Sequence, residues 1–515
     1  MSVRRFRLML GTFAALAVLA APLGAPLAAQ QLRTGAEQAQ WQRTTSHEEL
    51  LDFLFDVQAR TDRMRIVPLA TTAEGRMMPL VILGAPPMTT PGSAWLSGKP
   101  TLYITGSVHG GERSGTEGAL QFIRELTIGR HQDLLQRVNV LIIPSLNPDG
   151  AEAGRRTNSL GYDMNRDFIA LESPEISAAQ QVLLEWWPDV YVDAHNGGAF
   201  PYNLTYQATL HPAADSQLVA FARGPMFEAV KSHLQTQDMR LYWYSGPRRD
   251  RETGEWAWYT TEPWIRKQHS YGGLQNVLTL LYEVPGRHSL DVQAAAQREG
   301  YIGLMRFMAD NAEQVRRTVA GARMRTIQAT GRQIALATEN AAYPEKEQFY
   351  VMQEGQEALV TGENRTLYRA AKLRTRPWAY VFDSRLHEWA AHLQRHGVVV
   401  ERLAAPLEAR VERYNLTNIE WAEAPYQNHM MATVDVRISP AQMTFPEGAY
   451  LVRTAQNAGT IAMHLLEPDN DDSLVAWNFL DHSMPRPDST GQDARSVMPV
   501  YRVVAPTGVR ATVVR

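Results

Sequence analysis

Short apolar runs rich in β-branched and aromatic residues alternate with helix-like segments through the first part of the chain. Four such runs, each bounded by turn-forming residues, are typical of buried strands; they span residues 101–108, 138–143, 189–194 and 276–282. Between the first two, the apolar residues of segment 116–126 fall on one face of a helix. Strands alternating with helices predict an α/β fold with a mostly parallel or mixed sheet and helices on both faces.

The pattern changes after the helical stretch at 291–333, where Arg and Ala dominate. The strand-like runs that follow are shorter, and a helix is expected around Trp389; the runs lie at 379–382, 398–400, 432–437 and 450–452. We therefore expect a main domain at 40–320 and a smaller C-terminal α/β or β-rich domain at 345–515. The sequence does not define the role of the second domain.

The N-terminal residues form a separate unit. Three arginines within the first seven residues precede the apolar stretch 8–21, two prolines and a run of small residues that ends at Ala29. This layout predicts a secretory signal peptide at 1–29, because the prolines stop the apolar run short of the roughly 20 residues that a transmembrane helix needs. We expect an exported protein, periplasmic or secreted, with no stable membrane anchor after cleavage. The export route stays open.

Composition narrows the classes of partner and of site. The 515 residues are 44% hydrophobic and 20% charged, enough for a large core. Basic and acidic residues number 51 and 54, for a net charge of -3, so charge gives no reason to expect nucleic acid or an anionic membrane as a partner. The chain has no cysteine, so any metal must be bound by His, Asp or Glu. The oligomeric state is not indicated.

Candidate chemistry stands where three of the predicted strands end. His109 and Glu112 follow the strand at 101–108 and flank two glycines, His195 follows the strand at 189–194, and Glu283 follows the strand at 276–282. In an open α/β sheet, ligands bind outside the carboxyl ends of the strands. The two histidines and two glutamates are therefore expected to meet at one edge. Imidazole with carboxylate suits zinc better than calcium or magnesium.

In this chain order, the residues resemble the zinc metallocarboxypeptidases of the carboxypeptidase A and B type, and in particular a bacterial secreted member with a C-terminal extension. The matching positions are the HxxE pair His109 and Glu112, the NPDG turn at 147–150, the segments 155–158 and 161–168, His195 as third ligand and Glu283 as catalytic carboxylate. The resemblance covers roughly residues 45–310 and implies a metallocarboxypeptidase-like fold.

The resemblance also implies roles for the site residues. One zinc ion would be held by His109, Glu112 and His195, leaving a position for a water whose pKa falls to about 7. Glu283 would take the proton of that water and pass it to the leaving amine. Arg155 would face the scissile carbonyl and stabilise the oxyanion, with Arg156 as the alternative if the alignment shifts by one.

Asn165 and Arg166 would bind the free C-terminal carboxylate of a peptide, since a guanidinium binds carboxylate in a bidentate fork. Asp167 replaces the usual Asn of the family, and Asn196 with Gly197 replaces the common Ser-Tyr, so specificity is not copied from relatives. The catalytic tyrosine stays open between Tyr259 and Tyr271.

Three further segments have a more ordinary interpretation or an open one. The acidic loop at 467–472 lacks the pattern of an EF-hand, so we expect a solvated turn. Segment 386–397 carries histidines but reads as an amphipathic core helix that ends at a glycine. The aromatic segments 241–244 and 256–259 are compatible with a lid over the site or with an exposed hairpin.

The sequence thus predicts an exported zinc carboxypeptidase that acts on peptides with a free C-terminus. Two alternatives remain. One keeps the zinc chemistry as an amidohydrolase or carboxypeptidase acting on cell-wall muropeptides, and the other is a non-catalytic peptide-binding protein. Side-chain specificity is not predicted.

Overall fold

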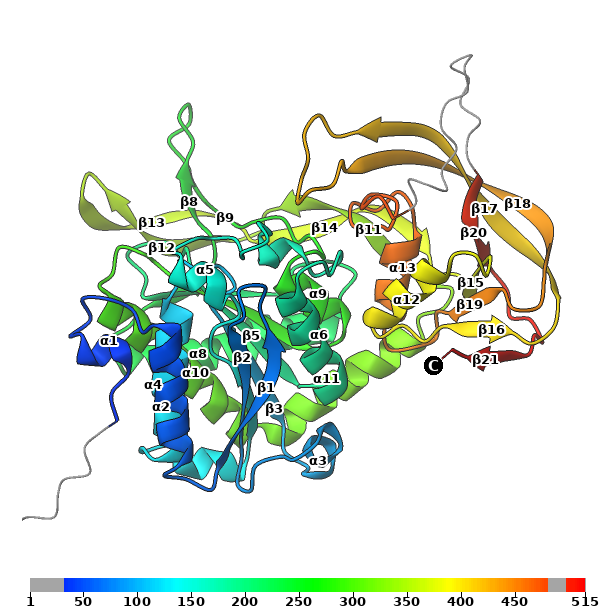
Figure 1. The fold of residues 1–515 in the computed structure, drawn as a ribbon. Helices are drawn as coiled ribbons and strands as arrows, with labels where there is room; N and C mark the ends of the chain where they lie inside the picture. Colours follow the sequence, from blue (N-terminus) through cyan, green and yellow to red (C-terminus); the bar gives the residue numbers. More distant parts are fainter. Residues whose placement is uncertain (1–31, 480–496, 515) are drawn as a thin grey trace, which may run out of the picture.

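The computed structural model describes residues 32–479 and 497–514, so the predicted signal peptide at 1–29 lies outside the described residues. The larger part of the molecule is built on an eight-stranded mixed sheet (Figure 1). In spatial order its strands are β1 (Met64–Thr71), β2 (Met77–Leu83), β4 (Asn139–Ile143), β3 (Thr101–Gly106), β5 (Val190–Asn196), β10 (Leu278–Val284), β6 (Leu204–Ala208) and β7 (Leu241–Trp243).

The centre of this sheet is parallel. Pairs β4·β3, β3·β5 and β5·β10 are parallel, whereas β1·β2, β2·β4 and β10·β6 are antiparallel. The three central strands β3, β5 and β10 therefore end at one edge. This is the edge at which the candidate residues were expected.

Helices cover both faces of the sheet, as predicted, and successive strand residues point into different cores. Leu102 and Ile104 of β3 belong to a core closed by the helices α2, α4, α8 and α10, and Tyr103 between them belongs to a core closed by α6 and α9. The bounds are α2 (His47–Gln58), α4 (Ser114–Thr127), α8 (Phe227–Gln235), α10 (Leu290–Asp310), α6 (Pro174–Trp186) and α9 (Gln268–Leu274). The α/β class is confirmed.

Further helices and helical turns join these elements. They are α1 (Gly35–Gln38), α3 (Pro91–Leu96), α5 (Pro148–Glu152), α7 (Ser216–Phe221), the longer α11 (Ala312–Ile327), the 3-10 turns η1 (Gln132–Gln136) and η2 (Met164–Arg166), and the π-helical turn η3 (Ala222–Met226). Among the described residues, no helix is both long and apolar enough to cross a bilayer.

Residues 346–365 belong with the main part of the molecule. Strands β12 (Lys346–Gln353) and β13 (Gln356–Arg365) form a four-stranded sheet with β8 (Gly246–Arg249) and β9 (Trp256–Tyr259), and β13 pairs directly with β9. The next pair, β11 (Gln333–Ala341) with β14 (Leu367–Thr375), leads away from it. The second domain was expected to start at residue 345. The hairpin β12–β13 that follows this position pairs instead with β9 of the main part.

The C-terminal sheet begins at Ala379 and is antiparallel throughout its described strands. Its order is β18 (Ala432–Phe445), β17 (Leu407–Trp421), β20 (Val497–Val503), β15 (Ala379–Phe382), β19 (Tyr450–Arg453), β16 (Glu401–Leu403) and β21 (Ala511–Val513), with helices α12 (His387–Arg395) and α13 (Gly459–Leu466). Helix α12 matches the predicted amphipathic helix, with Trp389 and Leu393 buried.

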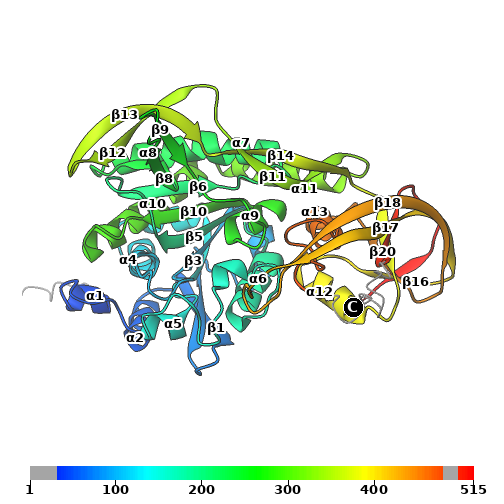
Figure 2. The ribbon, with the colours of Figure 1, turned by 90° about the horizontal axis from the view of Figure 1, so that it is seen from above.

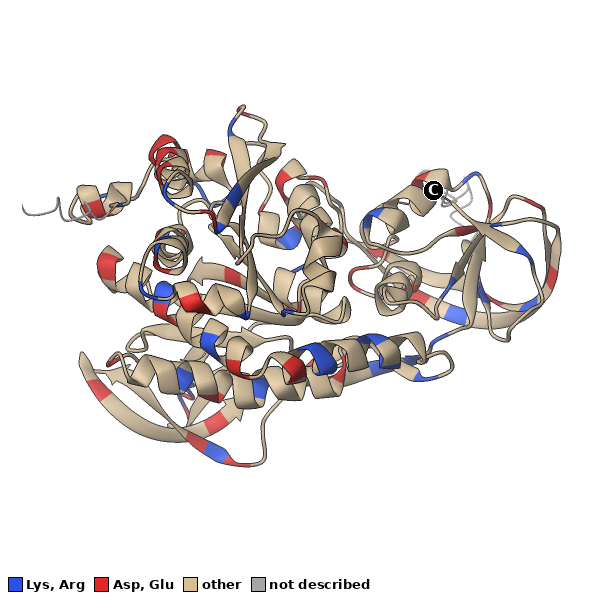
Figure 3. Cartoon of the chain, turned by 90° about the horizontal axis from the view of Figure 1, so that it is seen from below, with Lys and Arg blue, Asp and Glu red and all other residues tan. Residues whose placement is uncertain are grey.

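The C-terminal part lies beside the eight-stranded sheet rather than over it (Figure 2). The core behind α6 and α9 is continuous with it, since Ile169 and Tyr271 share a cluster with Leu393 and Trp477. Acidic and basic residues are interspersed over both parts in the view of Figure 3.

Candidate metal centre and active site

Three side chains from two neighbouring strand ends converge at the edge of the sheet. His109 lies in the loop after β3, Glu112 precedes α4, and His195 lies near the end of β5. The Nδ1 atoms of the two histidines are 3.1 Å apart, and the Glu112 carboxylate lies 2.8 Å from each of them. The ligand atoms of this group all lie within 4.8 Å of one another, so they can hold one metal ion.

The outer nitrogens of both histidines face carboxylates. Nε2 of His109 is 3.1 Å from Asp163 Oδ1, and Nε2 of His195 is 2.8 Å from Asp193 Oδ2. A carboxylate that accepts the Nε2 proton leaves the Nδ1 lone pair free for a metal and fixes the ring. Two nitrogens and one carboxylate oxygen, oriented in this way, fit the donor set of catalytic zinc.

Asp163 and Asp193 were not recognised in the sequence. A signal exists for Asp193, because it stands two residues before His195 on the same strand and so on the same face. Asp163 follows no such period, because it lies in the irregular segment before η2.

The ligand loop packs tightly against the NPDG turn. A methyl group on Gly110 would lie 2.1 Å from the backbone carbon of Gly150, whereas one on Gly111 would meet no atom closer than 3.9 Å. Asn147 caps this turn by accepting the N–H of Gly150, and its amide donates to the carbonyl of Val108. Gly110 is therefore required by close backbone approach.

Glu283 lies beside the ligand group. It ends strand β10 and is paired in register with His195 of β5. Its residue is only 6% exposed, and burial raises the pKa of Glu283 to about 8. A methyl group on Gly197 would lie 2.7 Å from Glu283 Oε2, so the departure from the family pattern at Gly197 makes room for this carboxylate.

The two candidate arginines differ in position. Arg156 donates to Asp163 Oδ2 at 3.0 Å and to Glu112 Oε1 at 3.2 Å, and it lines the pocket. Arg155 instead lies 3.5 Å from Glu74 and does not line the pocket. The geometry thus favours the alternative, Arg156, over the expected Arg155, because neighbouring residues in an irregular loop point to different sides.

Asn165 and Arg166 both line the pocket. Asn165 accepts the backbone N–H of Gln268 at 3.1 Å, and its Nδ2 lies 3.3 Å from His195 Nε2. Arg166 donates to the backbone carbonyl of Asn165 at 2.8 Å. The short turn η2 therefore places an amide and a guanidinium next to the ligand group.

A tyrosine outside the expected pair lies at the site. Tyr244, between β7 and β8, lines the pocket, and the charge of Glu283 raises the pKa of its hydroxyl. Tyr259 lies on β9 under Arg248, and Tyr271 is fully buried and hydrogen-bonded to Gln180. Of these three tyrosines, only Tyr244 lines the pocket, and no hydrophobic period marks it in the sequence.

The aromatic segments 241–244 and 256–259 were expected to form either a lid over the site or a hairpin. Trp258 is fully buried in the main core, so segment 256–259 packs on the sheet. Only Tyr244 of the two aromatic segments lines the pocket.

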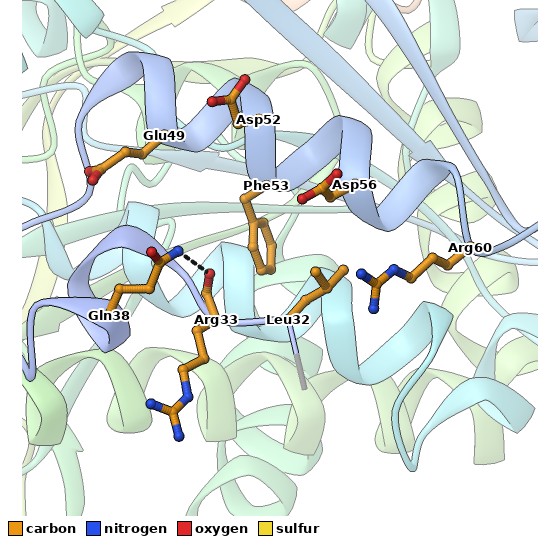
Figure 4. Close-up of a pocket in the computed structure, with 8 residues that line it drawn as sticks. All are labelled: Leu32, Arg33, Gln38, Glu49, Asp52, Phe53, Asp56 and Arg60. Atoms are coloured by element: carbon orange, nitrogen blue, oxygen red, sulfur yellow. Dashed lines mark hydrogen bonds between the residues drawn. The ribbon is translucent and has the colours of Figure 1, made fainter. Parts of the chain in front are cut away.

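The pocket has a volume of about 160 Å³. It is lined by His109, Glu112, Arg156, Asn165, Arg166, His195, Asn196, Gly197, Tyr244, Thr261, Lys267, His269, Leu281 and Glu283. A larger cavity of about 740 Å³ lies between α1 and α2 near Leu32, where the described chain begins (Figure 4). It contains none of the candidate site residues, so we place the chemistry in the smaller pocket.

The C-terminal part reaches the site through two contacts. Gln427, in the loop between β17 and β18, accepts the backbone N–H of Asp163 at 3.0 Å. Asp472 pairs with Arg266 at 2.6 Å, next to the pocket residue Lys267. The acidic loop 467–472 is therefore not the solvated turn that we expected, because its carboxylates pair with cations from other strands and from the segment before α9; Glu467 and Asp469 both contact Arg374.

Comparison with known proteins shows which family this chain resembles. Residues 50–225 match the model of the family described as zinc carboxypeptidase, and the match includes His109, Glu112 and His195. Together with the His-Glu-His site, this match supports a metallocarboxypeptidase, a zinc hydrolase.

The chain is also similar to other carboxypeptidases over different shares of its length. The chain is 23% identical over 467 residues to "Carboxypeptidase 2" of Trichophyton tonsurans, covering 84% of this chain and 81% of the relative. A shorter match, 30% identical over 159 residues, is to "Carboxypeptidase E" of Caenorhabditis elegans and covers 27% and 33%. A metallo-carboxypeptidase structure from Burkholderia cenocepacia is 22% identical, with a TM-score of 0.41 over 52% of this chain and 69% of that one.

Proposed function

We propose that this protein is an exported zinc carboxypeptidase that removes C-terminal residues from peptides. The observation that carries the proposal is the convergence, in one pocket, of a His-Glu-His group, a buried glutamate and a guanidinium next to an amide. The family match at residues 50–225 supports it. Export is proposed from the signal-like residues 1–29 alone.

His109, Glu112 and His195 would hold the metal. When bound there, zinc supplies a Lewis acid and lowers the pKa of a coordinated water to about 7. Asp163 and Asp193 act through the two imidazoles, which they orient.

Glu283 is the proposed general base. Its carboxylate is buried and directly beside the strand that carries His195, so it can take a proton from the attacking water and deliver it to the leaving amine.

Arg156 and Tyr244 would act on the carbonyl and the chain end. A guanidinium fixed by Asp163 is preorganised to stabilise the negative charge that develops on the scissile carbonyl oxygen. The hydroxyl of Tyr244 lies on the side of Glu283 and can donate to the substrate.

Asn165 and Arg166 would bind the terminal carboxylate. A guanidinium offers two parallel donors to a carboxylate, which an internal peptide bond lacks. The pocket therefore favours a chain end over a chain middle.

The test is mass spectrometry of a peptide library, half with free and half with amidated C-termini, after incubation with the mature protein and zinc. Stepwise loss from the free ends alone is expected. Cleavage of amidated peptides to the same extent would contradict the binding of the terminal carboxylate by Asn165 and Arg166. If muropeptides were cleaved in a parallel incubation and no library peptide were, the substrates would be muropeptides instead of peptides.

A further inference from the structure

A buried lysine lines the active-site pocket without an acidic partner. Lys267 immediately precedes α9 and is 4% exposed. It lines the same pocket as Glu283 and Arg166. A buried ammonium group is costly unless it is paired with an anion.

The contacts of Lys267 are few. Its ammonium group donates one hydrogen bond, to the backbone carbonyl of Glu262 at 2.8 Å, and lies 4.8 Å from the ring centroid of Trp264. Within the described residues it forms no ion pair with a carboxylate. Since an ammonium group has three N–H donors, two are left for another acceptor.

Arg266 and Arg374 are paired, in contrast, whereas Arg166 in the pocket forms, like Lys267, no ion pair within the described residues. Arg266, the residue before Lys267, forms an ion pair with Asp472. Arg374 forms ion pairs with Glu467 and Asp469. The carboxylates of Glu467, Asp469 and Asp472 are thus already engaged. The positive charge of Lys267 remains available to the pocket.

Lys267 lines the pocket together with Leu281 and His269. Leu281 stands two residues before Glu283 on β10 and so faces the same way, one layer deeper in the sheet. His269 lines the same pocket, and burial, followed by the charge of Arg166, lowers the pKa of Lys267. A residue whose α-carboxylate is held by Arg166 would direct its side chain toward a second cation.

We propose that Lys267 makes the protein prefer peptides whose C-terminal residue carries an acidic side chain, glutamate or aspartate. The inference rests on the proposed carboxypeptidase function, and it names the substrate class of that site. Arg166 binds the α-carboxylate, and Lys267 binds the side-chain carboxylate by a charge-assisted hydrogen bond.

The test compares kcat/KM for peptides that differ only in a terminal Glu or Gln. Glutamine has the same shape without the charge, so the ratio isolates the ion pair. The unchanged protein is expected to favour Glu by about tenfold to a hundredfold, as for a hydrogen bond between charged groups. Lys267→Met lowers that ratio at least about tenfold, mainly through KM for the Glu peptide, and Lys267→Arg keeps most of it. Lys231→Met, which changes a lysine on α8 outside the pocket, keeps the full ratio.

Two results would overturn the inference. One is equal kcat/KM for Glu and Gln peptides with the unchanged protein. The other is an equal loss for both peptides in Lys267→Met, which would assign Lys267 to the α-carboxylate instead.

Failure of the proposed function is distinguishable from these results. If no peptide with a free C-terminus is cleaved, the carboxypeptidase proposal fails while the preference can still be measured as binding. Calorimetry with Glu283→Gln protein then compares the same two peptides. Tighter binding of the Glu peptide supports the role of Lys267, and equal binding overturns it.

Discussion

The eight-stranded sheet and the C-terminal sheet differ in where the polar side chains at their strand ends lie. In the parallel centre of the first sheet, β3, β5 and β10 end together, and the side chains that follow them meet in one pocket. In the antiparallel second sheet, neighbouring strands end at opposite edges, and within the described residues no metal-binding group lies there. Loops of the C-terminal part instead contribute single residues, such as Asp472 and Gln427, which contact Arg266 and Asp163 beside the pocket.

This difference leads us to expect two kinds of mutational effect. Changes at the strand ends of the first sheet should remove turnover with little loss of stability. Changes in the second sheet should alter stability or the position of the site while leaving the chemistry in place.

The largest effect is expected from Glu283→Gln. The amide cannot accept a proton from water, so kcat should fall about 1000-fold, within the range for loss of a general base. Zinc content, measured by elemental analysis, should stay near one ion per chain. His195→Ala is the complementary variant, because it should lose the metal itself. Normal turnover by metal-replete Glu283→Gln protein would refute the assignment of the base.

Next is the ion pair between the two parts, probed by Asp472→Asn. The change leaves the buried guanidinium of Arg266 without its carboxylate, which should lower the apparent free energy of unfolding by about 3 kcal/mol. Asp383→Asn is the control, because its pair with Arg385 is exposed and should contribute little. Chemical denaturation of both variants checks the difference. Equal, small losses would mean that the acidic loop does not hold the two parts together.

The oxyanion role can be tested with two adjacent residues. Arg156→Ala should lower kcat about 100-fold, as for the loss of one preorganised donor, whereas Arg155→Ala should change it less than about twofold. The contrast follows from their positions, since Arg156 contacts Glu112 and Asp163 and Arg155 contacts Glu74. Steady-state kinetics with one peptide is sufficient. A larger effect of Arg155→Ala would assign oxyanion stabilisation to Arg155, as the sequence alone predicts.

These contrasts also indicate how far the sequence can be interpreted. The α/β class and the meeting of His109, Glu112, His195 and Glu283 follow from strand periodicity and from the geometry of parallel sheets, and the structure brings these residues together. Arg156, Tyr244 and Asp163 lie in irregular segments, where no period tells which way a side chain points. The pairing of loop 467–472 with residues about one hundred positions earlier depends on tertiary contacts that local sequence does not encode.

The acid preference should depend on pH. Burial, and next the charge of Arg166, lower the pKa of Lys267 to about 8. Lys267 is protonated below that value, so the preference for Glu over Gln should be largest near pH 7 and shrink several-fold by pH 9. Other charged groups that act on Lys267 are Glu262, Arg266, Asp472 and His269. Effects on Glu283 and Tyr244 act on both peptides alike and cancel in the ratio. A ratio that does not vary from pH 7 to 9 would contradict this expectation.

The smallest effect concerns the loop of the second sheet that reaches the site. Gln427 accepts the N–H of Asp163, whose side chain faces His109, so this contact holds the orienting carboxylate from outside. Gln427→Asn shortens the side chain while keeping a residue that tolerates its positive φ of 50°. The loss of one hydrogen bond should lower kcat/KM about threefold. Gln442→Asn, on the exposed part of β18, makes the same chemical change away from the site and should have no effect. If the two variants behaved alike, the second sheet would act on the first only through the stability that Asp472 and the shared core provide.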